Sequence, residues 1–135
     1  MNTRQKKIVI TKCDYQRLSN LLKSDYVQAI GAKPYLTGLR NELAVAQIVE
    51  PEEIGADVVT MNSKVRLVDL DINQDEFYTL VYPDQADIAK GKLSILTPIG
   101  TAIFGVRVGD VLTGLASQIL IDEIIFQPER EGIVL

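Results

Sequence analysis

The chain has 135 residues, with 14 lysines and arginines against 18 aspartates and glutamates, a net charge of −4, no histidine and one cysteine. The absence of histidine excludes Ser-His and Cys-His nucleophile pairs and His-ligated zinc or haem. The negative charge has the wrong sign for a protein that holds nucleic acid by neutralising phosphates. We therefore expect a binding protein with no catalytic residue, metal or cofactor. Its expected partner is another protein, without direct recognition of a nucleic-acid sequence.

The cysteine content and the start of the chain predict a cytoplasmic protein. The single Cys13 excludes an intramolecular disulfide and a cysteine metal cluster, and we expect it to be a small buried apolar residue. The polar N-terminus carries Arg4, Lys6 and Lys7, interpreted as a solvated end, and the apolar run Ile8–Ile10 is too short for a signal peptide. No stretch of 18 apolar residues predicts a membrane span.

The first half of the chain has helical patterns. Thr11 followed by Asp14 resembles a capping box, and the apolar residues after it predict a helix over about 12–23: Tyr15, Leu18, Leu21 and Leu22. After Gly31 and Pro34, a second set of apolar residues steps by three, four and three: Leu36, Leu39, Leu43 and Ala46. These patterns predict an antiparallel two-helix coiled-coil hairpin over 1–50.

Pro51 is expected to end the second helix and to open a linker over 51–56. From residue 57 onward, β-branched and aromatic residues predict a domain over 57–135 with these strands: Val58–Met61, Lys64–Leu70, Phe77–Tyr82, Leu93–Leu96, Val111–Thr113 and Gln118–Phe126. The segment from Pro98 to Gly105 predicts a short helix that crosses the sheet. The predicted fold class is α+β, a helical hairpin followed by an antiparallel β-domain.

Three separated motifs resemble one bacterial family. The segment Leu93–Asp110 resembles the signature of the Gre-factor C-terminal domain, an FKBP-like sheet. Val58–Val65 and Thr79–Pro83 are similar to its Rnk branch, known as regulators of nucleoside diphosphate kinase, and the ending Phe126–Glu129 agrees. Gly114–Ser117 departs from the family, because many relatives carry a Pro-Gly-Gly turn there. The resemblance implies a role at RNA polymerase, with nucleoside diphosphate kinase as a further possible partner.

In this family the β-domain docks on the rim of the polymerase secondary channel. Carried over by position, the resemblance puts Ser94 and Pro98 at the contact, with Ile95, Leu96 and Thr97 between them. The alternative is a plain strand and turn in which Pro98 only starts a helix. Both interpretations stay open, because one residue can do both.

The resemblance also bears on catalysis. Gre cleavage factors hold a magnesium ion with two acidic residues at the hairpin tip, since clustered oxygens bind such a cation. Here the tip, 24–34, contains only Asp25, flanked by Lys23 and Lys33. We interpret Asp25 as a solvated charge and expect no stimulation of transcript cleavage.

The main enzymatic alternative is peptidyl-prolyl isomerase activity, suggested by the FKBP-like resemblance. It needs a concave aromatic pocket. The chain has no tryptophan, and we interpret Phe77, Tyr78 and Tyr82 as core or cross-strand residues. The glycines near 100–109 lack the spacing of a phosphate-binding loop, and Arg107 and Asp110 are expected to be surface charges at a turn.

Overall fold

The structure is a computed structural model that describes residues 7–133. Its first helix, α1 (Lys12–Leu22), begins where the sequence predicts it, because the Thr11 hydroxyl accepts a hydrogen bond of 3.1 Å from the Asp14 amide. Leu18 and Leu22 are buried at helical spacing. Cys13 is exposed, so the prediction that it is buried was wrong. The first turn of α1 buries Asp14 instead.

The connection between the two predicted helices is itself helical. Helix α2 (Asp25–Ile30) is capped by Ser24, whose hydroxyl accepts from the Val27 amide at 3.3 Å. Val27 is 1% exposed and anchors this short helix to the core. Gly31 ends it with φ +89°, a conformation that favours glycine. The helical part therefore contains α1, α2 and a third helix.

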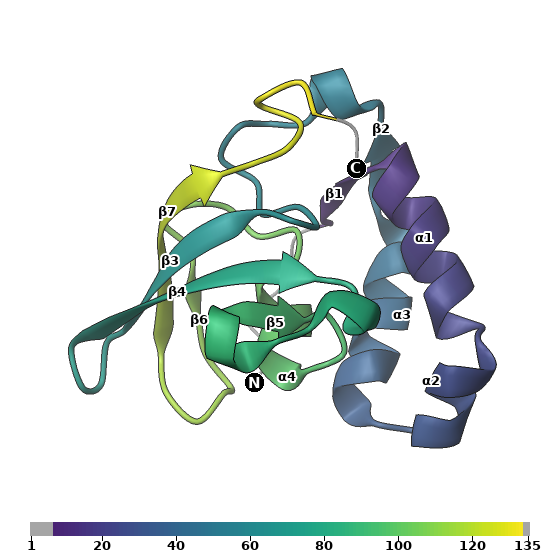
Figure 1. Ribbon diagram of the computed structural model, residues 1–135, viewed down its shortest axis with the longest axis horizontal. Helices are drawn as coiled ribbons and strands as arrows, with labels where there is room; N and C mark the ends of the chain where they lie inside the picture. Colours follow the sequence, from purple (N-terminus) through teal and green to yellow (C-terminus); the bar gives the residue numbers. More distant parts are fainter. Residues whose placement is uncertain (1–6, 134–135) are drawn as a thin grey trace.

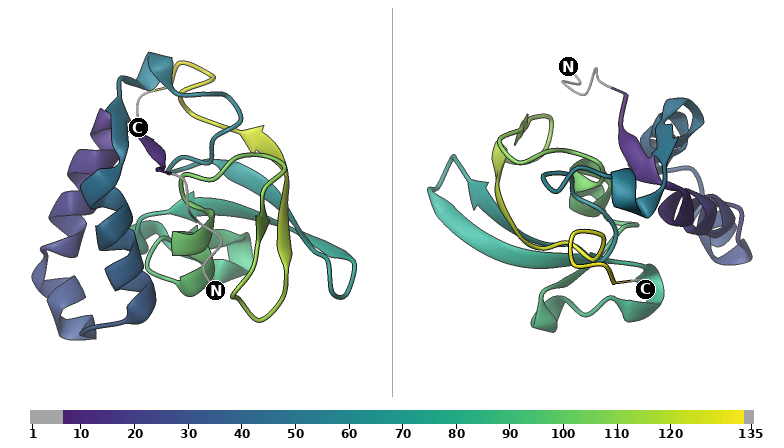
Figure 2. Two further views of the ribbon diagram at one scale, coloured as in Figure 1. Left: turned by 180° about the vertical axis from the view of Figure 1, so that it is seen from behind. Right: turned by 90° about the horizontal axis from the view of Figure 1, so that it is seen from above.

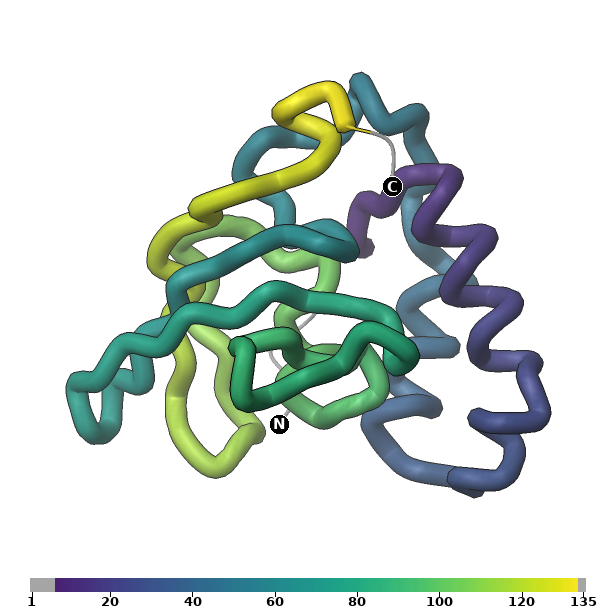
Figure 3. Tube along the Cα trace, viewed as in Figure 1, coloured from purple at the N-terminus to yellow at the C-terminus, as the bar shows by residue number. Residues whose placement is uncertain are grey.

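Helix α3 (Pro34–Val45) buries Leu36, Leu39 and Leu43 along one face. It runs opposite to α1, with α2 at the far end (Figures 1 and 3). The prediction that Pro51 ends this helix was wrong, because α3 ends at Val45. The next residues form strand β2 (Gln47–Val49), which pairs in parallel with β1 (Val9–Thr11) at the base of the helices. Pro51 then begins a 3-10 turn, Pro51–Glu53.

The second half of the chain forms a curled five-stranded sheet in the order β5-β4-β3-β7-β6 (Figure 1). Its strands are β3 (Lys64–Asp69), β4 (Gln74–Val81), β5 (Lys92–Ser94), β6 (Val111–Leu112) and β7 (Ile119–Phe126). The sheet is not wholly antiparallel as expected, because β4 and β5 pair in parallel. Two 3-10 turns, Pro83–Gln85 and Ile88–Lys90, carry the chain back so that β5 runs beside β4 in the same direction.

The predicted strand Val58–Met61 does not form. Only Val58 makes a single bridge, to Arg107, and Asn62 adopts a positive φ of 68°. The Ser63 hydroxyl accepts from the Thr60 amide at 3.0 Å, so a side-chain turn replaces the strand ladder here. The β-branched residues favoured a strand, but the hydrogen bond between the Ser63 side chain and the Thr60 amide stabilises a turn instead.

Helix α4 (Pro98–Ile103) confirms the predicted short helix and lies within the curl of the sheet (Figure 2). Its end is packed tightly: Ile103 and Phe104 are almost fully buried. At Gly105, with φ +78°, an added Cβ would stand 3.1 Å from Ile8. The sheet part and the β1 end of the helical part therefore pack closely at Gly105, where a side chain would strain the backbone and press on Ile8.

One continuous apolar core holds the molecule together. It contains Ile10, Leu18 and Leu39 from the helical part and Met61 and Ile121 from the sheet part, among others. Of the basic N-terminal residues, Lys7 is exposed, and Arg4 and Lys6 lie outside the described residues. Within residues 7–133, no helix is both long and apolar enough to cross a membrane.

A pair of glycine substitutions tests this packing. An alanine Cβ at Gly100 would overlap the carbonyl oxygen of Ser94, so Gly100→Ala is expected to destabilise the fold by about 1–3 kcal/mol. Gly38, in α3, has open space around it, so Gly38→Ala should stabilise the protein by about 0.5–1 kcal/mol. Urea unfolding of both variants measures the difference, and equal effects would contradict the tight contact at Gly100.

Candidate protein-binding surface

The segment Ser94–Pro98 joins the edge strand β5 to helix α4 through a closed set of hydrogen bonds. The Ser94 hydroxyl accepts from the Leu96 amide at 3.0 Å. The Thr97 hydroxyl donates to the Ser94 carbonyl at 2.7 Å and accepts from the Gly100 amide at 3.0 Å. The Ile95 amide donates to the Val81 carbonyl of β4. This turn is therefore held rigidly against the sheet.

The five residues of this segment differ in exposure. Ile95 is 0% exposed and Leu96 is 9% exposed, so both belong to the core. Ser94 and Thr97 are half-buried, and their hydroxyls are used within the turn. Pro98 is exposed at the first position of α4. Of the predicted contact residues, Pro98 thus presents the most surface.

Pro98 also borders a shallow groove of about 340 Å³. One wall is α3, with Pro34, Tyr35 and Leu39, and the other includes Pro98 and Leu115. The groove is mostly apolar because these side chains dominate its walls. A partner that contacts Pro98 would find an apolar surface next to it.

The tip of the helical part contains one carboxylate. Asp25 lies in the first turn of α2 and is exposed. No other acidic residue occurs over 24–34, and the described part of the chain contains no group of three or more His, Cys, Asp or Glu side chains that could hold a metal. The 12 residues of α3 span about 18 Å at 1.5 Å per residue.

Asp14 is the most unusual charged residue of the described chain, because it is only 6% exposed. Its carboxylate accepts from the Met61 amide at 3.2 Å and from the Tyr82 hydroxyl at 3.4 Å. Both donors belong to the sheet part, while Asp14 itself lies in α1. This residue therefore bridges the two parts.

The surroundings of Asp14 favour its neutral form. Burial, aided by the neighbouring Glu129 carboxylate, raises the pKa of Asp14 from 3.8 to about 7. The Met61 amide, the Arg17 charge and the Tyr82 hydroxyl act in the opposite direction. Burial and the Asp14 charge also raise the pKa of the Tyr82 phenol, so this hydroxyl remains a donor.

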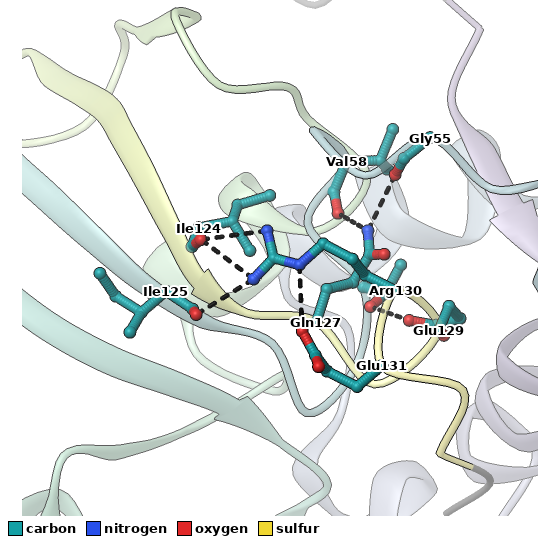
Figure 4. Close-up of polar contacts among 9 residues, drawn as sticks. Gly55, Val58, Ile124, Ile125, Gln127, Glu129, Arg130 and Glu131 are labelled. Atoms are coloured by element: carbon teal, nitrogen blue, oxygen red, sulfur yellow. Dashed lines mark hydrogen bonds and ion pairs between the residues drawn. The ribbon is translucent and has the colours of Figure 1, made fainter.

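Glu129 is positioned by the C-terminal turn, which Figure 4 shows. The Gln127 side-chain amide donates to the Gly55 and Val58 carbonyls, both at 2.8 Å. The Arg130 guanidinium donates to the Ile125 carbonyl at 3.0 Å. Glu129 accepts from the Thr60 hydroxyl at 2.7 Å, so the turn is fastened to the 55–60 loop next to Asp14.

The aromatic residues considered for an isomerase pocket do not share one. Phe77 is 47% exposed opposite Arg66, and the Tyr78 hydroxyl donates to Glu76. Tyr82 bonds to Asp14 instead. Of the two predicted environments, core or cross-strand, Phe77 has the cross-strand one, because it is exposed and lies opposite Arg66 of β3.

The predicted surface charges at the turn before β6 are paired. Arg107 is exposed and forms an ion pair of 3.0 Å with Asp57, and its amide donates to Asp110. Sequence reasoning identified these charges but missed the roles of Asp14 and Glu129. Asp14 was interpreted only as a helix-capping residue, and no sequence signal distinguishes a buried carboxylate from a solvated one in a first helical turn.

Family models match both halves of the chain. The model described as "Transcription elongation factor, GreA/GreB, C-term" matches residues 51–118, and the one described as "Rnk N-terminus" matches residues 6–49. A solved structure titled "Prokaryotic transcription elongation factor GreA/GreB from Nitrosomonas europaea" is 36% identical, with a TM-score of 0.76, over 90% of this chain and 100% of that one. The curled sheet with its helical part thus belongs to the GreA/GreB class of proteins.

Curated relatives narrow this class. The "Regulator of nucleoside diphosphate kinase" of Escherichia coli K12 is 36% identical over 130 residues, 93% of each chain. The "Transcription elongation factor GreA" of Chlorobaculum parvum is 43% identical over 77 residues, which cover 56% of this chain and 48% of that protein. The chain belongs to the Rnk family, and its homology supports a Gre-like regulator.

The raised pKa of Asp14 makes a prediction about pH and stability. Because the folded-state pKa lies above the unfolded value, this residue's contribution is complete below about pH 4 and is lost as pH rises through about 7. Asp14→Asn removes the ionisation, and its amide oxygen can still accept from the Met61 amide while its NH2 group donates to the Tyr82 hydroxyl oxygen. The variant should therefore gain stability relative to the native chain between about pH 4 and pH 7, by at most about 1.4 kcal/mol per pH unit.

Urea unfolding at several pH values measures this difference. Asp71→Asn is the matched control, since Asp71 is an exposed carboxylate in the turn after β3 and should leave the pH dependence unchanged. Parallel stability curves for the native chain and Asp14→Asn would show that Asp14 titrates normally.

Proposed function

We propose that this protein binds RNA polymerase near its secondary channel through the sheet part, and that it regulates transcription without stimulating transcript cleavage. The observation that carries the proposal is Pro98, exposed at the start of α4 on a turn held by a set of hydrogen bonds. Membership of a family with Gre-type elongation factors supports polymerase as the partner. A rigid turn loses little conformational entropy on binding, which favours affinity.

The tip of the helical part supports the absence of cleavage activity. Asp25 has no acidic neighbour on α2, and one carboxylate supplies too few oxygens to help hold a catalytic magnesium ion. Helices of this length also reach less far than a long hairpin. The helical part would then cover the channel entrance or compete there with cleavage factors.

A second candidate function comes from the name of the E. coli relative, a regulator of nucleoside diphosphate kinase. The direct form of this function is a complex between the chain and that kinase. Isomerase activity, suggested by an FKBP-like sheet, is less favoured because Phe77, Tyr78 and Tyr82 do not converge. Co-purification with purified kinase, with polymerase absent, separates the direct complex from regulation through transcription.

A pull-down with core RNA polymerase tests the docking surface. Pro98→Asp places a charge at the exposed first position of α4, where aspartate is compatible with a helix start, so the variant should fold. Loss of an apolar anchor should weaken binding by about tenfold or more. Ile72→Asp, at an exposed position in the β3–β4 turn, is the matched control and should bind as the native chain does. Failure of the native chain to bind polymerase would refute the proposal.

Stalled elongation complexes test the second half of the proposal. Adding the chain alone should release no shortened transcript, whereas a Gre cleavage factor serves as the positive control. Adding the chain together with that factor should reduce cleavage as its concentration rises. Cleavage stimulated by the chain itself would contradict the interpretation of Asp25, and undiminished cleavage by the Gre factor would refute competition at the channel.

A further inference from the structure

A second hollow lies between the helical part and the sheet part, and its lining shares no residue with the Ser94–Pro98 turn. It has a volume of about 360 Å³, and the end of α1, the start of α2 and the segment after β4 form its walls. Its lining residues are Leu21, Tyr26, Tyr82, Pro83 and Asp84. The walls thus combine apolar surface, two aromatic rings and one carboxylate.

The carboxylate of this hollow is available to a ligand. Asp84 is exposed, and no ion pair or hydrogen bond engages its side chain within the described residues. The basic residues at this end of α1 do not line the hollow: Lys23 lies outside it, and the Arg40 guanidinium donates to the Leu22 carbonyl. A cation entering the hollow would therefore meet an unneutralised negative charge.

The two tyrosines give the hollow aromatic walls. Tyr82 is held in place because its hydroxyl donates to the buried Asp14 carboxylate. Tyr26 is 60% exposed at the start of α2, so its side chain is accessible to a partner. Ring faces attract cations, most often arginine, through their negative electrostatic potential.

Arginine suits this combination of groups better than other side chains. Its planar guanidinium stacks on aromatic rings and pairs with a carboxylate, and its aliphatic stem packs on apolar surface such as Leu21 and Pro83. Lysine carries a more strongly hydrated point charge and cannot stack in this way. An acidic or phosphorylated group would be repelled by Asp84 and by the net charge of −4.

We propose that the hollow formed by Leu21, Tyr26, Tyr82, Pro83 and Asp84 receives an arginine side chain from a protein partner. The guanidinium would pair with Asp84 and stack against a tyrosine ring, so that the partner touches the helical part and the sheet part at once. This site shares no lining residue with the Pro98 groove, and its test does not depend on which protein the partner is.

An NMR titration of the full, isotope-labelled chain with Nα-acetyl-arginine amide tests the site. Saturable shifts are expected at Leu21, Tyr26 and Asp84. Nα-acetyl-citrulline amide, a neutral compound of nearly the same shape, should bind roughly tenfold more weakly because it loses both the ion pair and the cation–π contact. Nα-acetyl-lysine amide should fall between the two.

Variants of the chain complete the test. Asp84→Asn should weaken binding of the arginine amide by roughly threefold to fivefold, and Tyr26→Ala should weaken it by a similar factor. Asp71→Asn, another exposed carboxylate, should leave binding unchanged. Equal binding of the citrulline amide, or unchanged binding by Asp84→Asn, would overturn the proposal. Tighter binding of free L-arginine than of the amide would also overturn it, by indicating a free amino acid as the ligand.

Discussion

The buried carboxylate of Asp14 connects the two parts of the molecule at the edge of their shared core. Asp14 lies in the first turn of α1, but its carboxylate accepts hydrogen bonds from Met61 and Tyr82 of the sheet part. A carboxylate with so little exposure is costly unless it is hydrogen-bonded or neutral. Burial raises the pKa of Asp14, which means that the folded junction favours the protonated carboxyl over the charged one.

Glu129 and Tyr82 surround the buried Asp14 and complete the junction between the two parts. Gln127 holds the C-terminal turn (Figure 4), and Glu129 of that turn accepts from Thr60 and acts electrostatically on Asp14. Tyr82 has two roles, since its hydroxyl bonds to Asp14 while its ring lines the hollow next to Asp84. A ligand in that hollow would therefore contact a residue that also holds α1 against the sheet. Tyr82 therefore contributes both to the contact between the two parts and to the wall of the hollow.

The proposed docking turn depends on packing more than on its exposed atoms. Ile95 and Leu96 are core residues, and Gly100 leaves room for the Ser94 carbonyl. Their role is to hold Pro98 at the surface in one orientation. In the proposed function the sheet part would dock, and the helical tip, where Asp25 has no acidic neighbour, would carry no chemistry.

The sequence by itself predicted α1, α4, most of the strands and the family, because capping residues, hydrophobic periodicity and short motifs act within a few residues of one another. Only the tertiary structure decided where α3 ends, that β5 runs parallel to β4, and that Cys13 is exposed while Asp14 is buried. Each of these depends on contacts between residues far apart in the chain, such as β1 with β2 and Asp14 with Met61. Local patterns do not encode such contacts. Residues such as Thr11 and Asp14 are equally compatible with a helix start that is exposed to solvent and with one that is buried.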